Sequence, residues 1–283
     1  PADQRSHIPA SYATELLSIS NTLANMPEAE SSYVSGTQGI AVAIADSLLF
    51  ERGFDELEQA VLREPGDISP PDQIYRLRPG ADPEFDSFFG LTLPLLDRGL
   101  PLRLAHLEHA GLTGYLESID VLILSYDAMK PPQPETHQAI ADWVHSGGVL
   151  IYYGMPETLP FDEVEGWWRQ GAQIYGKPVH HLFEVLGVQP VSGQQAVRND
   201  KVLVIPKPIR ELAQSSSIAE QYVTIVQQAY LQSRMRSGPW NESTTLMVQR
   251  GPYLIARFLE NADKSTKQLD GVFLDLFDSH LPV

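Results

Sequence analysis

Residues 119 to 154 contain the feature that most constrains the fold: two apolar runs, IDVLILS and VLIYYG, separated by an amphipathic segment, PETHQAIADWVHSGG. Runs of Ile, Leu and Val without a polar face are typical of parallel strands that are covered on both sides. Between the runs, Pro134 favours a helix start, Ile140 and Val144 share one apolar stripe, and a Gly-Gly pair supplies a C-cap. The segment therefore predicts a βαβ unit within an open α/β sheet.

The rest of the chain extends this pattern. Further strands are predicted from the runs GIAVAIA, LPLRLAH and KVLVI, and helices over 12–26, from Asp82 onward and over 218–229. The charged and Pro-rich residues 51–83 predict a long excursion of the chain over the surface, as a loop. Near the C-terminus, TTLMVQRG, PYLIARFLEN and LDGVFLDLF predict an antiparallel β element.

These patterns indicate a mostly parallel α/β sheet with helices on both faces, of the flavodoxin-like kind, followed by a C-terminal antiparallel β element. We expect three parts: an N-terminal helix and linker at 1–35, the α/β domain at 36–240, and the start of a β-sandwich-like module at 241–283. Because the chain begins without Met and stops after an apolar run, we interpret it as a segment of a larger protein.

Composition excludes several classes of function. The chain has 20 Lys and Arg against 36 Asp and Glu, a formal charge of −16, which repels nucleic acid and anionic membrane surfaces. It has no cysteine, so disulfides, thiolate zinc sites and a cysteine nucleophile are excluded. No apolar run approaches the roughly 20 residues of a membrane span. A chain without cysteine fits the cytosol nearly as well as the periplasm, but we favour a bacterial periplasmic or secreted location over a cytoplasmic one.

Function in open α/β sheets lies beyond the carboxyl ends of the strands. The polar residues expected there are Asp46, Glu108, His109, Tyr126, Asp127 and Lys130. They could bind a sugar or complete the substrate pocket of a neighbouring domain. A purely structural alternative is that the two aspartates cap turns and the tyrosine packs under a loop. A paired-carboxylate glycosidase site is a further alternative, and it requires separations of about 5 Å or 6.5–9.5 Å.

No metal or cofactor site is predicted. His106 and His109 are three residues apart at a strand end, where alternation turns them to opposite faces, and His180 and His181 are adjacent on a predicted helix. Neither G-x-G-x-x-G nor a P-loop occurs, so no nucleotide cofactor is expected. Ser125 ends a strand, but no G-x-S-x-G elbow surrounds it.

Two neighbouring tryptophans form a separate candidate contact site. Trp167 and Trp168 stand in the segment EGWWRQG, and aromatic faces serve both carbohydrate sites and protein interfaces. The alternative is that one indole caps the core while the other lies half exposed.

The order of DSLLFERG, FFGLTLPLLDRGLPLRLAHLEHAG and GYLESIDVLILSYDAMKPPQPETHQAIADWVHSGGVLIYYG resembles the class I glutamine amidotransferase-like domain. More closely, it is similar to the version found as an accessory module in large bacterial glycoside hydrolases, such as the trimerisation domain of certain β-galactosidases. The resemblance covers roughly residues 36–233. It implies that the module follows a catalytic (β/α)₈ barrel and precedes a small β-sandwich.

Catalytic members of the amidotransferase family carry a Cys at the sharp turn after a strand, with a His and a Glu after a later strand. Here Gly154, Met155 and Pro156 follow VLIYY, and Pro206 follows KVLVI, so the resemblance implies a domain that does not hydrolyse glutamine.

Two hypotheses remain. The first is a non-catalytic scaffold, oligomerisation or pocket-completing module of a bacterial glycoside hydrolase, with an adjacent barrel or a second subunit as partner, carbohydrate as a possible ligand and a homo-oligomeric assembly. The second is a self-standing hydrolase or carbohydrate-binding protein that uses Asp46, Glu108 and Asp127. A scaffold should expose the apolar face of the 12–26 helix, whereas an independent enzyme should bury that helix and enclose a pocket at the strand ends.

Overall fold

The computed structural model describes residues 10–26, 31–49, 83–127, 129–154, 166–171, 174–189, 197–199, 201–234, 238–259 and 272–276. It divides into two compact units, one formed by residues 36–243 and the other by 1–35 together with 244–283. The expected surface excursion at 51–83 lies outside the described residues up to Asp82. Of the run LDGVFLDLF, which was predicted to belong to the antiparallel β element, residues 272–276 are described, and they form no strand.

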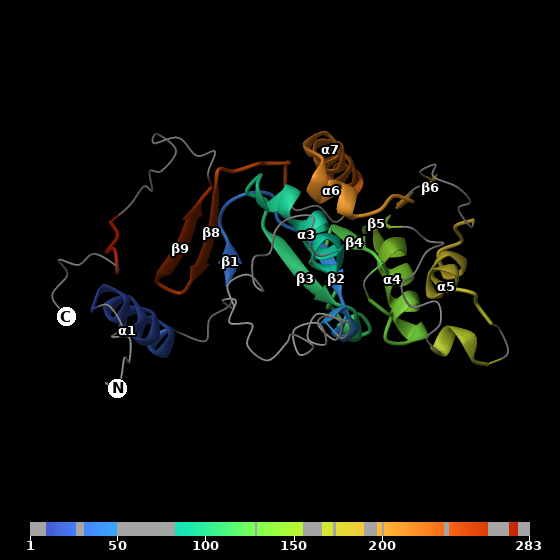
Figure 1. Cartoon of the computed structure of the whole chain (residues 1–283), viewed down its shortest axis with the longest axis horizontal. Helices are drawn as coiled ribbons and strands as arrows, with labels where there is room; N and C mark the ends of the chain where they lie inside the picture. The colour runs from blue at the N-terminus through green and yellow to red at the C-terminus, as the bar shows by residue number, and fades with distance from the viewer. Residues whose placement is uncertain are drawn as a thin grey trace, which may run out of the picture. The chain divides into compact units, whose positions relative to one another are not determined.

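The unit at 36–243 is an α/β domain, as predicted (Figure 1). Its described strands form a six-stranded sheet in the order β3-β2-β4-β5-β7-β6. The strands are β2 (Ile40–Ile44), β3 (Leu102–His106), β4 (Val121–Leu124), β5 (Val149–Tyr153), β6 (Val197–Asn199) and β7 (Val202–Ile205). All neighbours pair in parallel except β6, which pairs antiparallel with β7.

The five parallel strands lie in the order β3-β2-β4-β5-β7. If these five strands are counted along the chain from one to five, the order is 2-1-3-4-5, which is the doubly wound order of flavodoxin-like sheets. In this order the chain reverses its direction of winding between β2 and β4, so the crevice beyond the carboxyl ends of these two strands is the expected ligand position. The topology therefore directs attention to the residues that follow β2 and its two neighbours.

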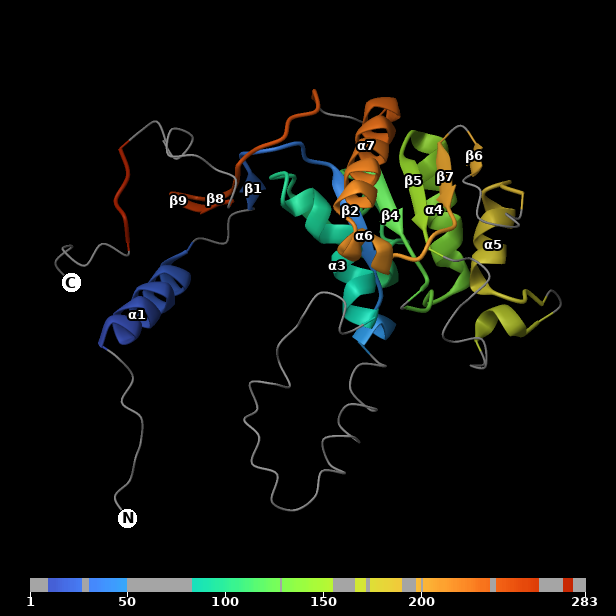
Figure 2. The same cartoon turned by 45° about the horizontal axis from the view of Figure 1, so that its top comes forward.

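Alternation along the strands divides the core into two layers (Figure 2). Leu122 and Leu150 face a layer that includes α4 (Pro134–Ser146) and α5 (Pro178–Val185). Ile123 and Ile151 face the opposite layer. That layer contains α3 (Pro83–Leu96), α6 (Arg210–Gln214) and α7 (Ser216–Gln232). With helices on both faces, the central strands can be apolar throughout, which explains their sequence pattern.

The second unit contains a three-stranded antiparallel sheet in the order β1-β8-β9, among the residues described. The long strands β8 (Thr245–Arg250) and β9 (Tyr253–Phe258) form a hairpin, and the short β1 (Ser32–Tyr33) pairs with β8. The antiparallel β element thus recruits a strand from the segment that the sequence analysis assigned to the N-terminal linker.

The same unit contains α1 (Ala10–Asn25), the expected N-terminal helix. None of its residues is buried, and Tyr12, Leu16, Leu17, Ile19 and Leu23 are exposed. A helix of this length is marginal in water without a packed apolar face. None of the described helices combines the length and apolarity that a bilayer span requires.

Candidate functional site

The carboxyl ends of β2 and β3 bring two of the predicted carboxylates together. Asp46 begins the 3₁₀ helix η1 (Asp46–Leu49) directly after β2, and Glu108 lies in η3 (Leu107–His109) directly after β3. The backbone N–H of Asp46 donates a 2.9 Å hydrogen bond to Oε1 of Glu108. The pairing of Ile44 with His106 explains this proximity, because the residues that follow two paired strand ends necessarily stand side by side.

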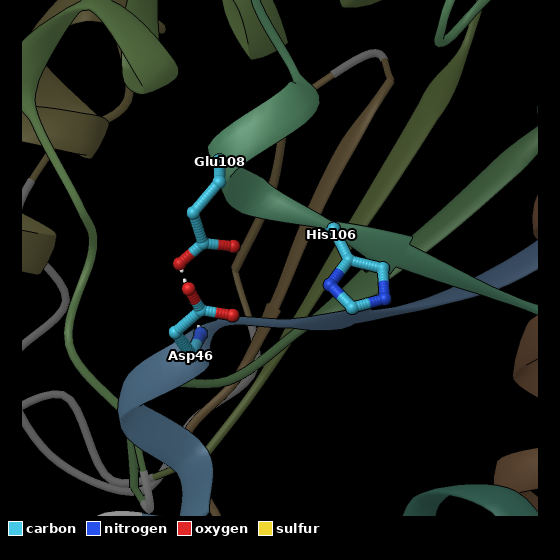
Figure 3. A group of neighbouring side chains, drawn as sticks. All are labelled: Asp46, His106 and Glu108. Carbon is cyan, nitrogen blue, oxygen red and sulfur yellow. Dashed lines mark hydrogen bonds between the residues drawn. The ribbon is translucent and has the colours of Figure 1, made fainter.

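His106, the last residue of β3, completes a cluster with these two carboxylates (Figure 3). One potential ligand atom from each of Asp46, His106 and Glu108 lies within 4.8 Å of the other two. Asp46 and His106 are exposed and Glu108 is half-buried. The sequence argument paired His106 only with His109 and so missed it as a partner of the carboxylates. No local pattern marks the cluster, because Glu108 lies in a 3₁₀ turn after β3, where strand alternation no longer applies.

His109 lies beside this cluster but is not a member of it. Its imidazole ring contacts the ring of His106, with centroids 5.7 Å apart, and meets the ring of Tyr115 edge-on at 5.6 Å. The hydroxyl of Tyr115 accepts a 2.9 Å hydrogen bond from the backbone N–H of His106. His109 therefore packs against the rings of His106 and Tyr115, next to the carboxylates.

Asp127 does not join Asp46 and Glu108 in this cluster. It follows β4 on the side of β5, where its backbone N–H donates to Oγ of Ser125 at 3.1 Å. A Cβ atom on Gly154 would lie only 2.5 Å from Oδ1 of Asp127, and Gly154 has a φ of +147°, so this close approach requires glycine. The three-carboxylate site considered for an independent hydrolase is thus divided between two places.

Lys130 takes part in a link between the loops after β2 and β4. Its backbone N–H donates to Oγ of Ser47 at 2.8 Å, and the Ser47 hydroxyl donates back to the carbonyl oxygen of Lys130 at 3.1 Å. These two bonds span the ends of the two strands between which the winding reverses. The link ties together the loops on either side of the expected ligand crevice.

Tyr126, which follows β4, lies in the protein interior rather than at the surface. It is fully buried, and its hydroxyl forms a 2.7 Å hydrogen bond with Nε2 of His137 on α4. Nδ1 of His137 in turn lies 2.8 Å from Nδ1 of His181 on α5. Burial, followed by repulsion from His181, lowers the pKa of His137 to about 3, and burial also lowers the pKa of His181.

The tryptophan pair divides between surface and core. Trp168 is buried, whereas Trp167 is half-buried and donates its indole N–H to the carbonyl oxygen of Pro131 at 3.0 Å. The ring of Trp167 also meets the rings of His137 and His181 edge-on. A single 3₁₀ turn, η4 (Trp167–Arg169), contains both tryptophans. Sequence analysis missed the His137 network, although His137 shares the apolar stripe of Ile140, Ala141 and Val144.

A surface hollow in the described part of the chain lies away from these residues. Val149, Lys201 and Gln228 line it, at the beginnings of β5 and β7 and beside α7. It therefore lies at the amino ends of these strands, at the opposite end from Asp46 and Glu108. No protein-family model matches the chain, and no curated protein matches it.

Proposed function

We propose that this chain is an accessory, non-catalytic module of a multidomain bacterial glycoside hydrolase, and that it assembles the parent enzyme into oligomers. The observation that carries this proposal is α1, a helix of 16 residues with no buried side chain. Its exposed Tyr12, Leu16, Ile19 and Leu23 recur at the spacing of one helical face. An amphipathic helix with its apolar face in water is typical of a protein interface.

The energetics favour a partner for this face. Burial of one Leu or Ile side chain stabilises a structure by roughly 1.5–3 kcal/mol, so covering several of these side chains offsets the entropy of ordering an otherwise marginal helix. A second copy of the chain would present the same apolar face, as a two-fold symmetric interface requires. The proposed assembly is therefore a homo-oligomer in which α1 packs at the subunit interface.

The carboxyl edge of the α/β sheet supports a non-catalytic role. Among the described residues, Ser125 makes no hydrogen bond to a histidine, and the buried His137 bonds to Tyr126 and His181 instead. Asp127 stands apart from Asp46 and Glu108, so the three carboxylates considered for an independent hydrolase do not converge on one point. This arrangement favours the module over the self-standing hydrolase.

Sedimentation equilibrium of the whole chain tests the assembly role. We expect a mass above that of the monomer, and we expect the double variant Leu16→Glu/Leu23→Glu to be monomeric because it places two charges on the apolar face. The double variant Ser18→Glu/Asn21→Glu adds the same charges to the polar face and should retain the wild-type mass.

Two results would refute the proposal. A wild-type chain that sediments as a monomer across the micromolar range contradicts the assembly role. Hydrolysis of a panel of aryl glycosides by the isolated chain contradicts the non-catalytic role. Circular dichroism of both double variants distinguishes loss of assembly from loss of the fold.

A further inference from the structure

We propose that Asp46, His106 and Glu108 form a binding site for one divalent transition-metal ion at the carboxyl edge of the α/β sheet. The three side chains come from the ends of β2 and β3, and Figure 3 shows them around a common space. This inference is independent of the assembly role of α1. It departs from the sequence analysis, which predicted no metal site.

The first argument is the ligand set. An imidazole nitrogen and two carboxylate oxygens are ligands that Zn²⁺ and Mn²⁺ accept together, whereas Mg²⁺ and Ca²⁺ prefer oxygen alone. Without a cation, two carboxylates held within 4.8 Å of each other repel. A bound divalent ion converts this repulsion into attraction.

The second argument is the state of Glu108. Its Oε1 accepts the backbone N–H of Asp46, but Oε2 is buried and has no hydrogen-bond partner among the described residues. A buried polar atom without a partner destabilises the fold, and a charged one does so more strongly. A metal ion in the space between Glu108 and His106 would satisfy this oxygen.

The geometry permits closure on an ion. Tetrahedral coordination with bonds of about 2.1 Å places ligand atoms ~3.4 Å apart. The ligand atoms of the cluster lie within 4.8 Å of one another, so binding requires movements of roughly 1 Å. Asp46 and His106 are exposed and can rotate, while the hydrogen bond from Asp46 orients Glu108. Three protein ligands leave a coordination position for water or for an oxygen of an incoming ligand.

Isothermal titration of the metal-free full chain with ZnCl₂ and with MnCl₂ tests the site. We expect one ion per chain, with affinity for Zn²⁺ at least tenfold above that for Mg²⁺ or Ca²⁺. His106→Gln and Glu108→Gln should each weaken Zn²⁺ binding at least tenfold. The matched control His109→Gln changes the same residue type three positions away and should bind within threefold of the wild type.

A second measurement identifies the ligands. Substitution with Co²⁺ gives a visible absorption spectrum that depends on the coordination sphere, and this spectrum should change in His106→Gln and remain in His109→Gln. Circular dichroism confirms that each variant is folded, and Asp46→Asn provides a third ligand variant. No binding of Zn²⁺ or Mn²⁺ up to millimolar concentration would overturn the proposal. So would stoichiometric binding that is unchanged in both folded variants His106→Gln and Glu108→Gln.

Discussion

Nδ1 of His137 on α4 lies 2.8 Å from Nδ1 of His181 on α5, so one imidazole donates a hydrogen bond and the other accepts it. Nε2 of His137 forms a hydrogen bond with the buried hydroxyl of Tyr126. A neutral His137 satisfies both contacts, because it carries one N–H and one acceptor nitrogen. The three side chains therefore join the end of β4 to both helices of one layer.

This arrangement predicts that the protein loses stability as the pH falls below about 6.5. Burial lowers the pKa of His137 to about 3 in the folded state, whereas the unfolded chain takes up the proton near 6.5. Unfolding therefore binds a proton between these values, and the free energy of unfolding decreases with decreasing pH. From pH 7 to pH 4.5 the expected contribution of His137 is roughly 2–3 kcal/mol.

Urea denaturation at several pH values measures this effect. The variant His137→Gln cannot titrate, so its loss of stability between pH 7 and pH 4.5 should be smaller than that of the wild type by the amount above. His145→Gln changes an exposed histidine on the same helix and should keep the wild-type pH dependence. Equal pH dependence of the wild type and His137→Gln would contradict the assignment.

A second prediction concerns the close approach of Gly39 to Asp120. Gly39 has a φ of +85°, and a Cβ atom there would lie 1.9 Å from Oδ2 of Asp120. We expect Gly39→Ala to lower the free energy of unfolding by roughly 2–4 kcal/mol, from backbone strain and displacement of the carboxylate. Gly111 has open space around its Cβ position, so Gly111→Ala should be neutral or slightly stabilising. Thermal unfolding compares the two, and equal midpoints would contradict the prediction.

The sequence predicted the α/β core because each central strand is apolar on both faces. The runs at β2, β4, β5 and β7 correspond to strands, and α7 follows the expected helical periodicity. β6 was missed because its residues, VRN, form a short antiparallel edge without an apolar run. β1 was missed because a two-residue strand has no local pattern and depends on its pairing with β8.

The site could be predicted only in part, for a topological reason. Position after a strand identified Asp46, Glu108 and Asp127, but the sequence does not state which strands are neighbours. The order β3-β2-β4-β5 places Asp46 beside Glu108, while Asp127 turns toward Gly154 at the end of β5. The network of His137 and His181 depends on the packing of α4 against α5, which no local pattern reveals.

A third prediction contrasts two buried tyrosines. The hydroxyl of Tyr222 on α7 donates a 2.9 Å hydrogen bond to the carbonyl oxygen of Leu91 on α3. The hydroxyl of Tyr152 is also buried, near Asp127 and the backbone of Tyr126, but it forms no hydrogen bond of normal geometry within the described structure. We expect Tyr222→Phe to cost about 1 kcal/mol and Tyr152→Phe to be neutral or stabilising.

Chemical denaturation of both variants at pH 7 tests this contrast. Each replacement keeps the aromatic ring and its edge-on contact, which involves Tyr153 for Tyr222 and Phe183 for Tyr152. The difference between the variants therefore isolates the hydroxyl group. A larger loss of stability in Tyr152→Phe than in Tyr222→Phe would show that the Tyr152 hydroxyl has a partner that stabilises the fold.

A fourth prediction concerns the link between Ser47 and Lys130, which joins the loops after β2 and β4. Ser47→Ala removes both hydrogen bonds and leaves the backbone N–H of Lys130 without its acceptor. We expect the amide of Lys130 to exchange with solvent on the order of tenfold faster, which corresponds to about 1.4 kcal/mol of local opening.

Hydrogen exchange measured residue by residue by NMR tests this link. Thr224→Ala removes an exposed side-chain hydrogen bond to Glu220 on α7 and serves as the control, because it should leave the Lys130 amide unchanged. Unchanged exchange at Lys130 in Ser47→Ala would mean that the two loops are held by other contacts. Faster exchange confined to Lys130 and its neighbours would instead identify Ser47 as the residue that holds the two loops together at the edge of the crevice.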